Sequence, residues 1–305
     1  MFSSKPRCQI VPLPDREVAF AVDGVERLRW NASKSAPRPF FYPLLGPSGL
    51  PLTRMGHPGA SNHDHHRSVW FAHHRVLGID FWSDQTTARI EQRKWHAYID
   101  GDQEALMAVE LAWYDGHDPQ PLILQDLVVS LAPASNDEIF LEIQTSLRST
   151  SESLELGVTN FGLLAVRVAK KISAVFGNGV LTGSSGRQGE QDLFGQPLEW
   201  VDYSGEVKDD CIEGITYFDH PSNSTFPSKW HVRDDGWMGA SICRDKPVLL
   251  RQEVPVTWRY LLHAHSGKVD HRRAKSIADM FAQRAPLEIM NDPRPHYEAT
   301  VRRVD

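Results

Sequence analysis

The chain has 305 residues, 41% of them hydrophobic and 24% charged, so it can bury a large core and lacks the composition of a disordered protein. Its formal net charge of −6 provides no basic stripe for a phosphate backbone, and we expect no nucleic-acid partner. The three cysteines (Cys8, Cys211 and Cys243) are widely spaced and odd in number, which is typical of free thiols in a reducing compartment. We find neither a signal peptide nor a run near the roughly 18 apolar residues that span a bilayer. These features predict a cytoplasmic protein with no membrane partner.

Most of the sequence consists of short extended runs that end at turn residues. Apolar, β-branched and aromatic residues predict strands, in chain order, at 17–22, 38–45, 89–99, 105–114, 122–131, 138–147, 170–176, 214–219, 247–254 and 257–265. Asp-Gly pairs at 23–24 and 100–101 are typical of hairpin turns. The Gly/Ser-rich stretch 182–189 predicts a loop.

Only the segment 270–283 has helical spacing, because its apolar residues from Ala274 to Phe281 fall at i, i+3, i+4 and i+7. Asp270 is the expected N-cap, and Pro286 ends the run. Many short strands and one late helix predict a mostly β fold, a large antiparallel β-sandwich. No repeat, low-complexity tract or composition shift marks a linker, so we expect a single domain over residues 1–305.

The strongest signal for function is a histidine cluster, since six of the 14 histidines lie in the segment 57–74. Neighbouring protonated imidazoles repel one another, so such a cluster is costly without a purpose. If residues 63–75 are extended, alternation places four basic side chains on one face: His63, His65, Arg67 and His73. His63 and His65 could then share a divalent metal ion (zinc, manganese or iron) or one substrate. The alternative is a set of polar loop residues satisfied by ordinary hydrogen bonds.

A second polar motif follows the strand predicted over 214–219. Asp219 and His220 come at its end, where β-sandwiches carry binding loops. An adjacent carboxylate and imidazole can perform acid–base catalysis or complete a metal shell. Asn223, Trp230 and Arg233 follow closely and are candidates for binding a substrate. Ordinary turn chemistry accounts for the same residues equally well.

Three weaker features complete the set. Glu190 follows the Gly/Ser-rich loop and could close over a substrate, although a plain loop is the simpler interpretation. His263 and His265 share one face of a predicted strand and are second-rank candidates for the same pocket. Tryptophans such as Trp70 flank the polar motifs, and an aromatic face beside imidazoles and carboxylates suits a sugar, which has an apolar C–H face and a polar rim. Tryptophan is also common in sandwich cores.

These motifs resemble the PmoA-like family of bacterial proteins. The resemblance rests on RPFFYPL (38–44), HHRSVWF (65–71), GIDFW (78–82), Glu190, WVDYSG (200–205) and DHPSN (219–223), and it covers residues 38–265. It implies a β-sandwich of the galactose-mutarotase-like kind in bacteria that degrade glycosides. The family name points to methane oxygenase, but that enzyme is a membrane complex and this chain has no spanning segment.

The predicted function is a carbohydrate-active enzyme that acts on a sugar, a keto-sugar or a small glycoside through proton transfer, in an epimerisation, elimination or hydrolysis. The catalytic candidates are His65, His66, Glu190, Asp219 and His220. The substrate-binding candidates are Arg67, Trp70, His73, Asn223, Trp230 and Arg233. Alternatives are a non-catalytic sugar-binding protein and a histidine-ligated metal oxygenase, and a homo-oligomer is compatible with either. The enzyme hypothesis requires the histidine segment and the Asp219–His220 pair to line one cavity.

Overall fold

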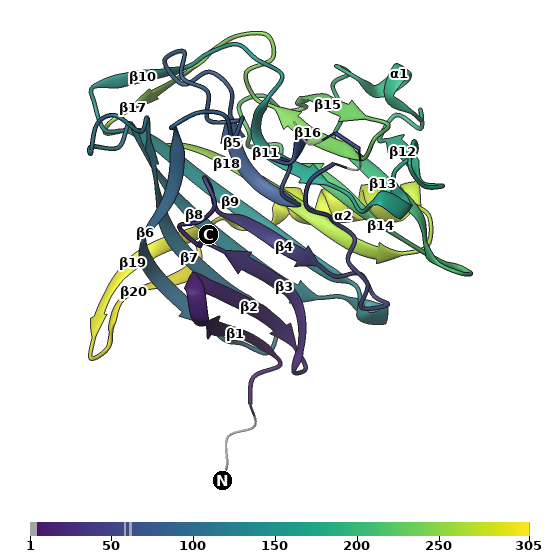
Figure 1. Ribbon diagram of the computed structural model, residues 1–305. Helices are drawn as coiled ribbons and strands as arrows, with labels where there is room; N and C mark the ends of the chain where they lie inside the picture. The colour runs from purple at the N-terminus through teal and green to yellow at the C-terminus, as the bar shows by residue number, and fades with distance from the viewer. Residues whose placement is uncertain (1–4, 58, 61–62, 305) are drawn as a thin grey trace.

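Two eight-stranded antiparallel sheets form the computed structural model, which describes residues 5–57, 59–60 and 63–304 (Figure 1). The first sheet has the order β1 (Cys8–Leu13), β2 (Glu17–Val22), β3 (Val25–Asn31), β4 (Phe40–Leu44), β5 (Val69–His73), β11 (Gly162–Arg167), β16 (Trp237–Ser241) and β15 (Lys229–Arg233). The second has the order β12 (Val180–Gly183), β13 (Trp200–Lys208), β14 (Cys211–Asp219), β18 (Val256–Ser266), β9 (Ile139–Ser149), β8 (Ile123–Pro133), β7 (Ala105–Tyr114) and β6 (Arg89–Ile99). Two-stranded sheets pair β10 (Ser153–Leu156) with β17 (Val248–Arg251) and β19 (Leu287–Arg294) with β20 (Tyr297–Arg303). The prediction of a mostly β, antiparallel sandwich is confirmed.

The core lies between the two sheets because apolar residues alternate along the strands. On β18, Trp258, Tyr260 and Leu262 point into the main apolar cluster, whereas Leu261 belongs to a separate cluster on the other face. On β5, Val69 and Phe71 belong to the main cluster in the same way. The faces turned away from the core are therefore free for a second layer or a site.

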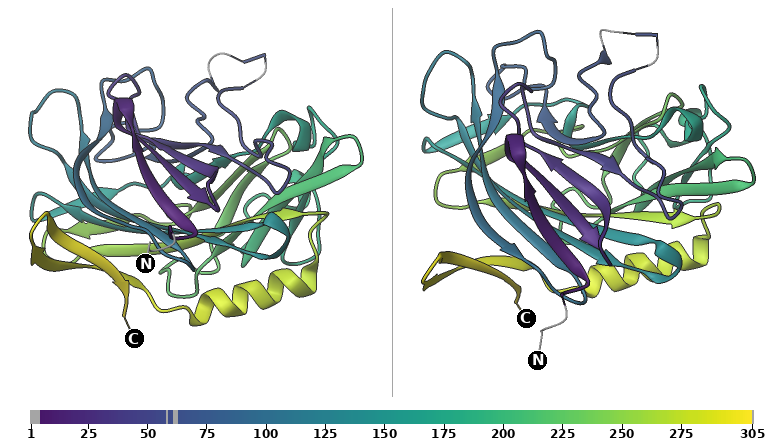
Figure 2. Two further views of the ribbon diagram at one scale, coloured as in Figure 1. Left: turned by 90° about the horizontal axis from the view of Figure 1, so that it is seen from below. Right: turned by 60° about the horizontal axis from the view of Figure 1, so that its bottom comes forward.

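The second layer on the outer face of the second sheet is α2 (His271–Gln283), as the sequence predicts. Ala274, Ile277 and Phe281 pack on the sheet, and the Asp270 side chain caps the helix by accepting from the amides of Arg272 and Arg273. Figure 2 shows α2 on one side of the molecule and the loops that precede β5 on the other. In the described part of the chain the other α-helix is α1 (Glu190–Leu193), and no helix there has the length and apolar character needed to cross a membrane.

One strand prediction is wrong, and the extended conformation considered for residues 63–75 is found only in part. Residues 170–176 form a 3-10 turn (Lys170–Ile172) in place of a strand, because Ser173 Oγ donates to the carbonyl oxygen of Lys170 at 2.8 Å and Ile172 turns into the core. The segment 63–75 is extended only over β5. Before β5 the backbone turns, since the amide of His66 donates to the carbonyl oxygen of His63 at 3.0 Å.

A buried ion network attaches α2 and the β19–β20 hairpin to the second sheet. Glu142 on β9 is fully buried and accepts from Arg259 on β18 and Arg303 on β20, at 2.9 and 2.8 Å. Arg284, at the end of α2, lies 3.3 Å from the same carboxylate and donates to Glu104 at 2.8 Å. Charges so far from water are stable only when all are paired.

We therefore expect Glu142→Gln to lower the free energy of unfolding by about 3–5 kcal/mol, because it leaves buried guanidinium groups without their carboxylate. Urea unfolding measures the change. An m-value equal to that of the wild type shows that the variant exposes the same surface area on unfolding. Glu298→Gln removes the exposed pair with Lys94 and is the matched control, with an expected loss under about 1 kcal/mol. Equal losses in the two variants would show that the buried network is not a main source of stability.

Candidate functional site

A cavity of about 460 Å³ opens on the outer face of the first sheet. Its floor is made by alternate residues of neighbouring strands, Arg167 on β11, Trp237 on β16, and His231 and Arg233 on β15. The intervening residues Val166, Met238 and Val232 point into the core. The walls come from the loops that carry His63, His65, His66, His74, Asp80, Trp82, Ser83, Phe161 and Asp235.

Aromatic side chains dominate the floor and one wall. Trp70, Trp82 and Trp237 form one buried cluster, with ring centroids 5.1–5.8 Å apart. His66 lies 4.8 Å from the Trp237 ring, and His231 lies 5.8 Å from it. Phe161 extends this aromatic surface toward the solvent, since it is 37% exposed and contacts His231 edge-on at 4.9 Å. Two imidazoles thus share one tryptophan platform.

A buried ion pair holds the back of the cavity. Arg167 is fully buried and donates to both oxygens of Asp235 at 2.7 and 3.0 Å. Asp235 stands in the β15–β16 turn, where Gly236 has a φ of +101° and a Cβ would come within 2.9 Å of Val168. Burial opposes ionisation of Asp235, but the hydrogen bonds and charge of Arg167 outweigh it and keep the pKa of this carboxyl below its usual value.

The same Asp235 attaches the start of the histidine segment. Its Oδ2 accepts from His57 Nε2 at 3.1 Å, and its backbone oxygen accepts from Arg54 at 2.8 Å. The end of the segment is attached separately, because Arg67 pairs with Asp84, which also pairs with the buried Arg38 at 3.0 Å. The histidine-bearing loop is therefore fixed at both ends by ion pairs with the neighbouring loops.

The buried imidazoles at this site are held in the neutral form. Burial lowers the pKa of His66 far below its usual value, and the neighbouring His65 adds to the effect. Burial, followed by the charge of Arg233, lowers the pKa of His231 to about 4. The Nδ1 atoms of both rings are buried and have no hydrogen-bond partner in the described part of the chain. Both rings are therefore uncharged at neutral pH, where an imidazole with so low a pKa is a weak base.

Of the carboxylates Asp80 and Glu190, only Asp80 lines the cavity. Asp80 Oδ1 accepts from the amides of Trp82 and Ser83, and its Oδ2 lies 4.0 Å from His74 Nε2. Glu190 does not line the cavity; it pairs with Arg233 Nε at 3.1 Å and accepts from the amide of Asp234. Its role in this geometry is to orient Arg233.

The second predicted motif is elsewhere, and the expectation of one shared cavity is wrong. Asp219 is buried, where it accepts from Asn223 Nδ2 at 2.6 Å and from the amide of Ser228. His220 contacts α2, with Nε2 3.1 Å from the carbonyl oxygen of Phe281. Asp219, His220 and Asn223 therefore stabilise the end of β14 and the docking of α2, since a strand of the second sheet cannot reach the outer face of the first.

Two candidates for substrate binding point away from the cavity because of strand alternation. Trp230 on β15 is fully buried in the core, where its indole N–H donates to the carbonyl oxygen of Leu198 at 2.8 Å. His73 on β5 faces the same way as Phe71, and its Nε2 donates to the carbonyl oxygen of Gly157 at 3.0 Å. The next residue, His74, lines the cavity instead. Arg67 is engaged by Asp84, and Trp70 lies beneath the floor.

The proposed metal pair does not have the geometry assumed from an extended segment. The ring of His65 lies closer to His66 (4.3 Å between centroids) than to His63 (6.0 Å). Among the described residues, one group of three has ligand atoms within 4.8 Å of one another: His96, Glu110 and Asp126, on β6–β8. Arg148 lies 3.5 Å from both carboxylates of that group and already supplies a cation. A metal held by His63 and His65 stays a prediction.

Sequence reasoning missed several residues that shape the cavity. Arg167 closes an apolar strand, and a lone arginine after four apolar residues was a signal that it needed a buried partner. Phe161, Asp80 and Asp235 had no such local signal. They lie on loops that are far apart in the sequence, and only the fold shows that these three residues lie at one cavity.

Comparison with known proteins places the chain in a family. No curated protein matches the sequence. A crystal structure of a GalM/aldose epimerase homologue from C. elegans has a TM-score of 0.34 and 9% identity, over 85% of this chain and 99% of that one. A polysaccharide lyase has a TM-score of 0.30 and 8% identity, over 95% of this chain and 36% of that one. Likenesses this weak carry no functional argument.

The family model that matches residues 17–279 is described as a family of unknown function, DUF6807. No PmoA-like family matches, so the family expected from the sequence motifs is wrong. The chain belongs to the family of unknown function DUF6807.

Proposed function

We propose that the cavity on the first sheet binds a small carbohydrate and that His66 and His231 transfer protons to and from it. The observation that supports this most is the pairing of the two neutral imidazoles with one tryptophan platform, Trp237. A pyranose can lay its C–H face on an indole and turn its hydroxyls toward polar groups at the rim.

The size and lining of the cavity support a small ligand. Its volume of about 460 Å³ falls within the range of about 300–1,000 Å³ that is usual for small-molecule sites. Asp80 and Ser83 line one side, and Arg233 lines the other, so hydroxyl groups would meet both acceptors and donors. The tight Arg167–Asp235 pair is already satisfied and would act as a fixed wall.

Proton transfer is assigned to the imidazoles because both of them line the cavity, whereas the carboxylates predicted from the sequence, Glu190 and Asp219, do not. The Asp219–His220 pair is removed from this proposal because it lies against α2, and Glu190 is retained only as the partner of Arg233. A neutral His231 or His66 can take a proton from carbon or oxygen, and the resulting imidazolium can return it. Such a step begins an epimerisation or an elimination at a carbon next to a carbonyl.

Trp82→Leu should weaken sugar binding about tenfold, because it removes one side of the aromatic lining, and such contacts contribute about 0.5–1.5 kcal/mol. Isothermal titration against aldohexoses, uronic acids and 3-keto-glycosides measures the change. Trp95→Leu is the matched control, since Trp95 is 37% exposed on β6 of the other sheet. If Trp95→Leu has the larger effect, the sugar binds elsewhere.

His231→Gln and His66→Gln should each lower turnover by about 10²–10⁴-fold, the range typical of a lost general acid or base. The assay is ¹H NMR in D₂O with the same sugars, which reports exchange of C–H protons, change of configuration and release of an aglycone together. His117→Gln, at an exposed turn, is the matched control and should keep full activity. Sugars that bind but never change in the wild type would establish the alternative, a non-catalytic binding protein.

Buried neutral imidazoles also predict how stability depends on pH. The pKa values of His73, His220 and His231 are lowered to about 4, and that of His66 lies lower still, in each case first through burial. The unfolded chain protonates these groups near pH 6.5, so the stability they contribute is complete above that pH and is lost as the pH falls toward 4. Asp219 changes the stability in the opposite direction, because burial raises its pKa to about 6 and its contribution to the free energy of unfolding therefore increases as the pH falls.

Four imidazoles with lowered pKa values outweigh Asp219 and His265, whose pKa values are raised. We therefore expect the free energy of unfolding to fall between pH 7 and pH 5, by about 2 kcal/mol for each of the four imidazoles before these opposing contributions. Urea unfolding at the two pH values measures it. His231→Gln should reduce the difference, whereas His117→Gln should leave it unchanged. A protein equally stable at both pH values would show that these imidazoles are not buried in the neutral form.

A further inference from the structure

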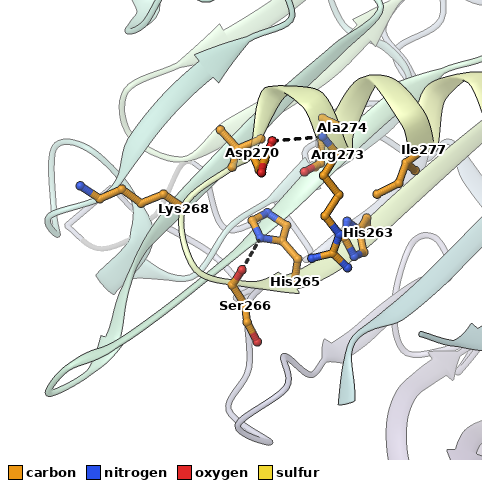
Figure 3. A pocket seen from close by; sticks show the side chains of 10 residues that line it. His263, His265, Ser266, Lys268, Asp270, Arg273, Ala274 and Ile277 are labelled. Carbon is orange, nitrogen blue, oxygen red and sulfur yellow. Dashed lines mark hydrogen bonds between the residues drawn. The ribbon is translucent and has the colours of Figure 1, made fainter. Parts of the chain in front are cut away.

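A second, smaller cavity lies on the opposite side of the molecule, at the N-terminal end of α2 (Figure 3). Its volume is about 130 Å³, which corresponds to about four water molecules at about 30 Å³ each. It is lined by Thr216, His263 and His265 from the second sheet and by Lys268, Asp270 and Arg273 from the loop and first turn of α2. A sugar ring does not fit this space, but a tetrahedral or planar oxyanion does.

Two carboxylate–imidazole pairs form the base of this cavity. His263 Nε2 lies 2.8 Å from Glu138, and His265 Nε2 lies 2.8 Å from Asp202. All four residues are buried, and the two imidazole centroids are 5.2 Å apart. Strand alternation places both histidines on the outer face of β18, beside α2 and away from the core.

The two imidazoles differ in what they can still bind. His265 has acceptors at both nitrogens, because Nδ1 also lies 3.3 Å from the carbonyl oxygen of Ser266. Burial lowers its pKa, but the Asp202 carboxylate outweighs burial and raises the pKa above its usual value, which favours the cationic form of the ring. Burial lowers the pKa of His263, whose Nε2–H donates to the Glu138 carboxylate.

His263 therefore keeps an unprotonated Nδ1 that makes no hydrogen bond within the described residues, although the side chain is only 3% exposed and its ring lines the cavity. Because Nε2 is occupied by Glu138, Nδ1 is the atom left to accept a proton donor from a ligand. A ligand or water that enters the cavity can supply the hydrogen bond that this nitrogen does not receive from the protein.

Charges of both signs border that acceptor, and the nearest carboxylates are already paired, Glu138 with His263 and Arg273 and Asp202 with His265. Figure 3 shows the Arg273 side chain reaching toward His263, and the Lys268 side chain extending away from the two imidazoles. Arg273 is partly neutralised by Glu138, whereas Lys268 is exposed and forms no ion pair with any described residue. The N-terminus of α2 adds its partial positive charge, and Asp270 is already engaged in capping it.

We propose that this cavity binds a small oxyanion that carries a hydroxyl group, such as hydrogen phosphate or bicarbonate. The ligand hydroxyl would donate to His263 Nδ1, and its negative oxygens would face Arg273. Lys268 also lines the cavity, is exposed, and would turn its ammonium group toward the bound anion. An oxyanion without a proton, such as sulfate, lacks the donor for Nδ1 and would leave that nitrogen unpaired.

The test is isothermal titration of the full-length protein at pH 7, in a buffer free of phosphate and carbonate, with inorganic phosphate, bicarbonate and sulfate in separate runs. We expect phosphate or bicarbonate to bind at least tenfold more tightly than sulfate. Tighter binding of either phosphate or bicarbonate than of sulfate supports the proposal. The comparison of phosphate with bicarbonate shows which of the two anions the cavity prefers.

Lys268→Gln should weaken that binding about tenfold without affecting the fold, because Lys268 is exposed. Lys275→Gln is the matched control on the same helix, where Lys275 pairs with Asp279, and should bind as the wild type does. His263→Gln should bring the affinity for phosphate down to that for sulfate. The proposal would be overturned if neither phosphate nor bicarbonate bound, or if sulfate bound as tightly as they do. It would also be overturned if Lys275→Gln lost as much affinity as Lys268→Gln.

Discussion

The candidate site depends on one buried ion pair, Arg167 with Asp235. A guanidinium with no solvent contact is tolerated only beside a carboxylate in good geometry, and the two hydrogen bonds of 2.7 and 3.0 Å provide it. This pair joins the end of β11 to the β15–β16 turn, and the same Asp235 also accepts from His57. The floor and the histidine-bearing wall of the cavity therefore share one anchor.

Strand alternation determines whether each polar residue on a strand faces the core or the outer surface of its sheet. On the first sheet it turns His231 and Trp237 outward to the cavity and sends Trp230 and His73 inward. On the second sheet it turns His263 and His265 outward, under the start of α2. The two sheets and the core between them separate these groups. The molecule thus carries two polar centres, the aromatic cavity for which we propose a sugar and the small charged pocket for which we propose an anion.

The elements that could be predicted have a local cause. Asp270 marks the start of α2 through its own hydrogen bonds, and the Asp-Gly pair at 100–101 separates β6 from β7. Strands such as β5 and β16 were not predicted. The histidine segment could be identified as a candidate site from its composition alone. Its conformation could not, because the turn at His63–His66 is held by contacts with Asp235 and Asp84, which lie far away in the sequence. The same reason explains why Asp219 and His220 were placed in the wrong cavity. One domain over 1–305, a cytoplasmic location and a homo-oligomer stay predictions.

We propose that the aromatic cavity on the first sheet binds a carbohydrate, and a crystal structure of the wild-type protein soaked with the sugar that binds most tightly in solution tests this directly. We expect a sugar ring stacked on the tryptophan cluster, with hydroxyls or a carbonyl oxygen within hydrogen-bond distance of His66 or His231. A sugar bound on another face, or an empty cavity in a crystal soaked well above the dissociation constant, would contradict it.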